Sequence, residues 1–371
     1  MEVNGVGNPS KRPTNPGEFA HPSSSPYPAH PSPNRSVSHL LRQARQCALA
    51  ILALAPFLPF GAARAEPDSA GIWTLQGENA AISLQRPRDH FYTNGLRLGW
   101  VSPGTMVPEV MADLTRGLWG DGETRMGVAL SQRIDTPADT HTPNPSPHGQ
   151  PYAGLLLGEF TLLSDTATTR KMLSLGLGVV GPLAGARNSQ NGFHDLICHP
   201  AVEGWGHQIP NTTAIELTHE RIWRFGLGAA AGAEVDVLPS LAAGIGDLRD
   251  YIQAGITVRI GQGLDADFGV PRPRPGLNGG DAYTPRSAPS WYVFAGANAQ
   301  AVAYDLLLQS APFRSGPHVS PVWDVAELQG GFAVMVNGMR LTLAYVAQTP
   351  EFHGQTGGLH QFASASLSLR F

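Results

Sequence analysis

The chain has 371 residues, of which 25 are Lys or Arg and 29 are Asp or Glu, for a formal net charge of −4. This balance offers no basic surface of the kind that binds nucleic acid, so we expect no nucleic-acid partner. The two cysteines, Cys47 and Cys198, are too few for a disulfide framework, and no cysteine or histidine spacing indicates zinc.

The N-terminal part divides into two segments that precede the folded domain. Residues 1–40 are rich in Pro, Ser, Asn and His, so we expect either a disordered extension or a start codon assigned too early. Residues 41–65 combine basic Arg42 and Arg45, a short apolar run and the small-residue site Ala63-Arg64-Ala65. This order is typical of a signal peptide cleaved after Ala65, and the alternative is a buried core helix. The domain is then expected at residues 66–371.

The remainder of the chain shows apolar and polar residues in strict alternation. In the C-terminal run, Leu367, Leu369 and Phe371 alternate with Ser366 and Ser368. Segments of about ten residues with this period are typical of strands in an outer-membrane barrel, and the terminal Phe also fits one. A soluble β-sandwich is the alternative, because its strands alternate as well.

The predicted fold is all-β: a transmembrane antiparallel β-barrel of about 12 strands, with a short helix in an extracellular loop. The expected strands span residues 71–79, 91–102, 124–134, 153–163, 170–181, 212–223, 226–238, 249–262, 290–304, 320–336, 339–349 and 359–371. An even number puts both ends of the barrel chain on one side of the membrane, as bacterial barrels require.

Three short connections are expected at the periplasmic end, namely Ser164–Thr169, Arg224-Phe225 and Asn337-Gly338, of which the last is a strong hairpin signal. The loops at 80–90, 135–150 and 181–211 then share the outer rim. Two other connections, 103–123 and 263–288, are long for periplasmic turns.

The loop at 181–211 is the longest of those on the outer rim, and loops of such length are usually functional or disordered. Its centre predicts a helix over Ser189–Cys198, in which Gln190 and His194 are four residues apart and share one face. A histidine is the commonest general base near neutral pH, so we expect this loop to carry the chemistry.

Several sequence islands around these loops resemble the lipid A deacylase family of outer membranes, the 3′-O-deacylases of lipopolysaccharide. They occur in the same order as in the family and extend over nearly all of residues 66–371. The islands are YTNGLRLGW (92–100), QPYAGLLLGEF (150–160), GVVGPLAG (178–185), QNGFH (190–194), GWGHQI (204–209) and TPEFHGQ (349–355).

The resemblance implies a calcium-dependent barrel that hydrolyses an ester-linked 3′-O-acyloxyacyl chain of lipopolysaccharide, its substrate in the outer-membrane bilayer. The family's catalytic histidine and the glutamine before it match His194 and Gln190. Its Tyr-Thr motif matches Tyr92 and Thr93, and its active-site asparagine matches Asn79.

Ester hydrolysis requires a base for water and a group that stabilises the developing oxyanion. In this scheme His194 takes the water proton, Gln190 orients the imidazole or the water, and calcium with help from Thr93 polarises the carbonyl. The sequence has no Gly-x-Ser-x-Gly motif, so a serine acyl-enzyme is not indicated.

The chain departs from the family pattern at three positions. Ala80 replaces the aspartate after Asn79, which is the expected calcium carboxylate, and Glu78 and Asp89 are the remaining candidates for a metal ligand. Gly149-Gln150 replaces an Asp-Arg pair. The only lysine after residue 65 is Lys171, on a strand, so the family's loop lysine has no counterpart.

Two other functions stay open. The protein could be a degenerate barrel that has lost hydrolysis with its metal site, or a small pore with a narrow lumen.

Other conspicuous residues are given structural roles or none. Thr93 is expected to face inward with Arg97. Trp205 and Trp100 are predicted to be membrane-interface aromatics. The segment Tyr152-Ala153-Gly154 is predicted to support the loop by packing, and Cys198, His199 and His207 have no assigned role.

Overall fold

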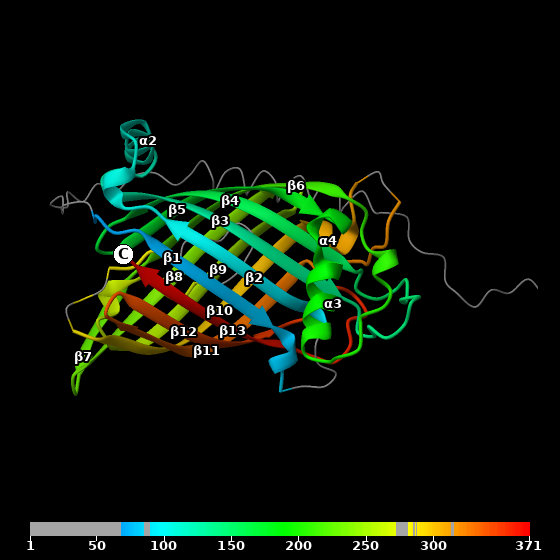
Figure 1. Ribbon diagram of the computed structural model, residues 1–371. Helices are drawn as coiled ribbons and strands as arrows, with labels where there is room; N and C mark the ends of the chain where they lie inside the picture. The colour runs from blue at the N-terminus through cyan, green and yellow to red at the C-terminus, as the bar shows by residue number, and fades with distance from the viewer. Residues whose placement is uncertain (1–67, 85–89, 272–280, 285, 287, 313–314) are drawn as a thin grey trace, which may run out of the picture.

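The computed structural model describes residues 68–84, 90–271, 281–284, 286, 288–312 and 315–371 (Figure 1). The expected disordered extension at 1–40, the signal peptide at 41–65 and Asp89 lie outside these residues. The strands are β1 (Ile72–Asn79), β2 (Phe91–Val101), β3 (Glu123–Thr136), β4 (Ala153–Asp165), β5 (Thr169–Val180), β6 (Thr212–Trp223), β7 (Phe225–Ala230), β8 (Ala233–Gly246), β9 (Arg249–Gln262), β10 (Ser290–Asp305), β11 (Asp324–Val336), β12 (Met339–Gln348) and β13 (His360–Arg370).

The helices lie in the connections between strands. The α-helices are α2 (Glu109–Trp119), α3 (Ala186–Leu196) and α4 (Leu306–Gln309), and short 3-10 turns span Ala80–Ile82, Gly104–Met106, Pro182–Ala184, Trp205–His207 and Leu264–Ala266. Within the described ranges, no helix has the length and hydropathy needed to traverse a bilayer.

The strands form one antiparallel sheet that closes on itself. The sheet runs from β6 through β1 and β13 to β8 and β7, and an additional pairing between β6 and β8 joins its two ends. Strand β7 continues in line with β6 along the same partner: Ile222 lies opposite Ser240, and Phe225 opposite Val237. Because β6 and β7 form one element of the wall, the barrel has twelve strands, as predicted.

The predicted strand over 226–238 and the predicted turn at Arg224-Phe225 are wrong. The chain reverses instead at Ala231 and Gly232, where φ is 54° and 82°. A two-residue hairpin turn of this kind needs positive φ at both positions, which glycine adopts without strain. Nothing at Arg224-Phe225 favours positive φ, so the sixth strand runs past the predicted turn. The hairpin of β7 and β8 extends the wall beyond the neighbouring strands (Figure 1).

The alternating pattern separates the two faces of the wall as expected. On β13, Ser366 and Ser368 are buried in the lumen, whereas Leu367 and Leu369 are about two-fifths exposed on the outside. An outward apolar belt suits the hydrocarbon of a bilayer, and the polar interior is filled by hydrogen-bonded side chains. The outer surface carries further exposed apolar residues, including Leu75, Leu98, Leu130, Leu177 and Leu341.

The two ends of the barrel differ in their connections. The hairpin at Asn337-Gly338, with φ of 51° and 75°, lies at the end where β1 begins and β13 finishes. The short β4–β5 connection lies at this same end, which is therefore periplasmic. Helices α3 and α4 lie at the opposite, extracellular end (Figure 1).

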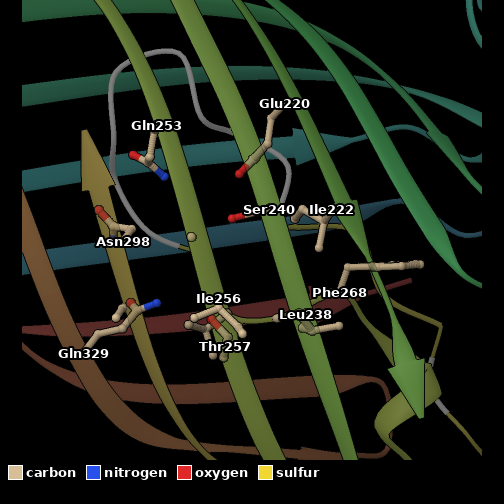
Figure 2. A pocket seen from close by; sticks show the side chains of 14 residues that line it. Glu220, Ile222, Leu238, Ser240, Gln253, Ile256, Thr257, Phe268, Asn298 and Gln329 are labelled. Carbon is tan, nitrogen blue, oxygen red and sulfur yellow. The ribbon is translucent and has the colours of Figure 1, made fainter. Parts of the chain in front are cut away.

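One long periplasmic connection, between β9 and β10, folds into the mouth of the barrel. Its Asp267 is buried and lies 2.5 Å from Arg259 and 3.1 Å from Arg340. Farther along, Asp281 lies 2.6 Å from Arg97 of the wall. The connection therefore plugs the periplasmic mouth through buried ion pairs. Figure 2 shows a cavity beside the plug, where Phe268 meets wall residues that include Ser240, Gln253, Asn298 and Gln329.

Candidate active site

Helix α3 presents one buried face, which carries the predicted catalytic pair. It begins after Gly185, whose φ is 72°, and its buried residues are Ala186, Gln190 and His194. These positions repeat every four residues, so they lie on a single face. The predicted helix is present, although it starts three residues earlier than expected and ends at Leu196.

This helix lies against the outer surface of the barrel wall. It contacts β3 and β4, where Ala186 packs in one cluster with Ile134, Tyr152 and Trp205. A Cβ atom on Gly154 would lie only 2.5 Å from the Cβ of Ala186, so the absence of a side chain lets α3 approach the wall. Arg133 and Asp135, on either side of Ile134, form an ion pair on the inner face.

The pairing of residues across β1 to β4 shows that Asn79, the predicted active-site asparagine, lies on the same face of the wall as α3. Gly154 is opposite Ile134, Ile134 is opposite Asn94, and Asn94 is opposite Asn79. Residues directly opposite in an antiparallel pair share a face, and strands are about 4.8 Å apart. Asn94 and Asn79 therefore lie on the same outer face as α3, two and three strands from Gly154, respectively. In Figure 1, α3 lies across the wall near the outer ends of these strands.

Thr93 lies at a bulge in β2, and its predicted inward orientation beside Arg97 does not hold. The register between β2 and β3 shifts between Tyr92 and Asn94, which leaves Thr93 as the extra residue. An extra residue interrupts the alternation of faces. The Thr93 hydroxyl lies 2.7 Å from that of Thr136, a residue that alternation puts on the same face as Ile134.

The residues on either side of Asn79, Glu78 and Ala80, both lie on the inner face of the wall. Glu78 is buried on the inner face and accepts a hydrogen bond of 2.8 Å from the Tyr92 hydroxyl. Asn79 points the other way, and its side chain accepts a bond of 2.7 Å from the backbone N–H of Ala81. Ala80 is buried in an apolar cluster with Tyr92 and Phe362. Glu78 is thus separated by the wall from the site that includes Asn79.

The imidazole of His194 is held in one tautomer by the chain that follows α3. Its Nδ1 lies 2.7 Å from the carbonyl oxygen of Pro200. A carbonyl can only accept, so Nδ1 carries the proton and Nε2 carries the lone pair of the neutral ring. The ring of His199 packs edge-on against it at 4.6 Å. His194 therefore has the protonation pattern of a general base at Nε2.

Gln190 is oriented by a tryptophan whose role the sequence did not indicate. Trp205 Nε1 donates to Gln190 Oε1 at 3.0 Å, and Trp205 is only 2% exposed. Trp205 is thus a buried support for α3, and its predicted position at the membrane interface is wrong. Its ring packs against Tyr152 at 4.9 Å, which agrees with the predicted packing role of Tyr152-Ala153-Gly154.

By this arrangement, one polar atom of the Gln190 side chain is left without a partner in the described part of the chain. Because Trp205 engages the side-chain oxygen, the amide nitrogen Nε2 is the donor left over, and this buried atom has no hydrogen-bond partner among the described residues. A buried donor without a partner costs free energy unless water or a ligand accepts its bond. Gln190 is thus prepared to donate to a bound molecule.

The described residues do not build a calcium site here. No group of three or more His, Cys, Asp or Glu side chains among them could hold a metal ion. The outer face offers neutral oxygens from Asn79 and Thr93, whereas the nearby carboxylates of Glu78 and Asp135 are on the inner face. Calcium prefers carboxylate oxygens, so this donor set fits it poorly.

The fold and site define a class: an outer-membrane β-barrel with a helix-covered polar site on its outer wall. The family model described as outer membrane protein LpxR matches residues 47–371. The chain therefore belongs to the LpxR family and is an outer-membrane protein, which confirms the resemblance to the lipid A deacylases.

A solved structure supports this fold. LpxR from Salmonella typhimurium is similar with a TM-score of 0.68 and 20% identity, over 80% of this chain and 99% of that one. The β domain of the Bordetella autotransporter BrkA is similar with a TM-score of 0.38 and 11% identity, over 82% of this chain and 100% of that one. A comparison with curated protein sequences finds no match.

The close approach of α3 to the wall predicts the effect of a single methyl group. We expect Gly154→Ala to push Ala186 and α3 outward and to lower deacylation of lipid A, while the barrel stays folded. Gly158→Ala is the matched control: it lies on the same face of β4, and its nearest contact for a Cβ is an ordinary 3.6 Å. Equal activity of the two variants in an acyl-release assay would contradict the expected displacement.

Proposed function

We propose that this protein is a lipid A deacylase that hydrolyses an ester-linked 3′-O-acyloxyacyl chain of lipopolysaccharide. The observation that carries the proposal is the place of α3, which holds Gln190 and His194 against the outside of the wall at the extracellular end. A site on the lumen side could not meet a lipid in the bilayer. A site on the outer wall can receive a lipid directly from the outer leaflet.

The proposed reaction uses one water and one imidazole. Nε2 of His194 takes a proton as the water oxygen adds to the ester carbonyl carbon, which gives a tetrahedral oxyanion. The bond from that carbon to the sugar oxygen then breaks, and the imidazolium returns its proton to the leaving oxygen. The products are a free fatty acid and a sugar hydroxyl.

Donors on the outer face support the charge in this reaction. Nε2 of Gln190 and the hydroxyl of Thr93 are proposed to donate to the oxyanion, with Asn79 as a further polar group beside them. Trp205 holds the Gln190 oxygen and so keeps the amide nitrogen directed to the site. No step is assigned to calcium, because the described residues do not fit it.

The test is acyl release from lipid A by the purified protein, read by mass spectrometry with calcium and with a chelator. Loss of one acyloxyacyl unit supports the proposal, and an unchanged mass contradicts it. The family resemblance predicts that calcium is required. If activity survives the chelator, the neutral donors suffice and the calcium prediction is wrong.

The alternative function, a degenerate barrel without hydrolysis, and the proposed deacylase predict opposite effects of Ala80→Asp on activity. If loss of the aspartate abolished activity, Ala80→Asp should restore it. Because Ala80 is 1% exposed among apolar side chains, we instead expect the new carboxylate to destabilise the barrel by about 1–3 kcal/mol with no gain in activity. The midpoint of urea unfolding and the acyl-release assay decide between them, with Ala81→Asp on the exposed side of the turn as control.

The third function, a small pore, is disfavoured by the plug in the periplasmic mouth. Buried ion pairs of Asp267 and Asp281 hold the plug to the wall. A conductance in planar bilayers equal to that of an open barrel would support a pore after all.

A further inference from the structure

Helix α2 lies outside the barrel at its periplasmic end, at the opposite end from the proposed lipid A chemistry. It belongs to the β2–β3 connection, which is long for a periplasmic turn. Figure 1 shows α2 projecting from the wall near the C-terminal end of β13. Its contacts are with outward-facing residues of the wall rather than with the lumen.

The wall beneath α2 carries polar side chains where apolar ones are expected. Lys171 is on the outward face of β5 with Leu175 and Leu177, and His219 is on the outward face of β6, opposite Leu173. Both are less than 10% exposed. An outward lysine is costly in a lipid environment, so this part of the wall needs a cover.

Helix α2 supplies that cover through its C-terminal turn. The Lys171 Nζ donates to the carbonyl oxygen of Trp119 at 2.6 Å, which also places a positive charge at the negative end of the helix. The Trp119 ring lies 5.9 Å from that of His219. Thr115, one turn earlier, is buried and bonds to Thr124 at 2.7 Å. One face of α2 is thus fixed to the wall.

The neighbouring face of α2 is apolar and exposed. Val110, Leu114 and Leu118 recur every four residues and are 69%, 46% and 42% exposed. On a third face of the helix are Asp113 and Arg116, both exposed. This division into a wall-bound face, an apolar stripe and a charged face is typical of a helix at a membrane interface.

The apolar stripe is continuous with the lipid belt of the barrel. Trp100, Val128, Phe160 and Leu175 lie opposite one another on four successive strands and form an outward row on the side of the barrel that carries α2. The last three are 38–48% exposed. Trp100 also packs against Trp73 on the outer face, and paired aromatics mark the level where hydrocarbon meets head groups.

We propose that α2 is a membrane-interface helix, with Val110, Leu114 and Leu118 inserted among the lipids of the periplasmic leaflet. The occupant of the stripe is lipid rather than a protein because the stripe joins the belt and the charged face turns away from it. The helix covers the outward polar side chains of Lys171 and His219, presents an apolar surface in their place, and anchors the barrel at its periplasmic end.

The test measures whether a label on α2 is in contact with lipid or with water when the protein is in lipid vesicles. Single cysteines are introduced by Leu114→Cys and, as a matched control on the charged face, Asp113→Cys, in a chain whose Cys47 and Cys198 are serine. Each carries a nitroxide label, and Leu175→Cys gives the reference for the lipid belt. We expect the label at 114 to collide more with oxygen than with a water-soluble nickel chelate, as at 175, and the label at 113 to show the reverse.

Equal access of the nickel chelate to positions 114 and 113 would overturn the proposal and would indicate a water-exposed stripe left for a protein partner. Folding of each variant is checked by its heat-dependent migration in a gel. If Leu114→Cys does not fold, a bimane label at Leu118→Cys in vesicles of brominated phosphatidylcholine gives a second readout. Quenching there supports insertion, and unchanged emission contradicts it.

Discussion

Replacing His194 by alanine is expected to lower the rate of acyl release from lipid A by about 10²–10⁴-fold, the usual contribution of a positioned general base. The reason is the tautomer: the Pro200 carbonyl holds the proton on Nδ1, so Nε2 is the atom that can accept from water. Binding of lipid A should change little, because the imidazole acts on water. The measurement is initial acyl release at saturating lipid A, by mass spectrometry.

The matched control is His207→Ala, which removes an exposed imidazole of the same loop that has no role in the proposed chemistry. It should keep the wild-type rate. Full activity of His194→Ala would remove His194 as the base. Equal loss in both variants would indicate damage to the loop rather than to the reaction.

Replacing Asp267 by alanine is expected to destabilise the barrel by about 3–5 kcal/mol. The reason is that the guanidinium groups of Arg259 and Arg340 stay buried but lose a negative charge that pairs with them. Both arginines are 0% exposed, and Tyr292 also donates to Asp267 at 2.9 Å. The measurement is the urea midpoint for unfolding in micelles. Asp265→Ala is the control, since its exposed pair with Arg286 is worth at most about 1 kcal/mol. Equal midpoints would show that the plug adds no stability.

The same carboxylate predicts how stability changes with pH. Burial works to raise the pKa of Asp267, but Arg259, Arg340 and the N–H of Gly269 outweigh it and lower the pKa below the ordinary value of 3.8. The charged form is therefore favoured in the folded state. Its contribution is full above about pH 4 and is lost as pH falls through the lowered pKa. Asp267→Asn should lose less stability than wild type over that acidic range.

Some parts of this protein could be predicted from local sequence because they depend only on the spacing and type of residues that are close together in the chain. Alternation with a period of two fixes which side chains face lipid, so Leu367 and Ser368 were correctly assigned to opposite faces. Asn337-Gly338 defines a hairpin because both residues tolerate positive φ. Gln190 and His194 share a helix face because they are four residues apart.

Other parts depend on contacts between distant segments, which periodicity does not contain. A bulge adds one residue without changing composition, so the sequence could not show that Thr93 leaves the face of Arg97. The turn at Ala231-Gly232 depends on β6 and β8 keeping one register. The burial of Trp205 depends on α3 docking against the wall, where Gly154 leaves room.

The sequence alone therefore determined that this chain forms a membrane barrel and which loop carries the histidine, because both follow from spacing along the chain. The tertiary structure decided that the candidate site is on the outer wall, that the β9–β10 connection plugs the mouth, and that α2 lies outside. Those outcomes depend on strand register and on buried charges that meet only after the sheet has closed.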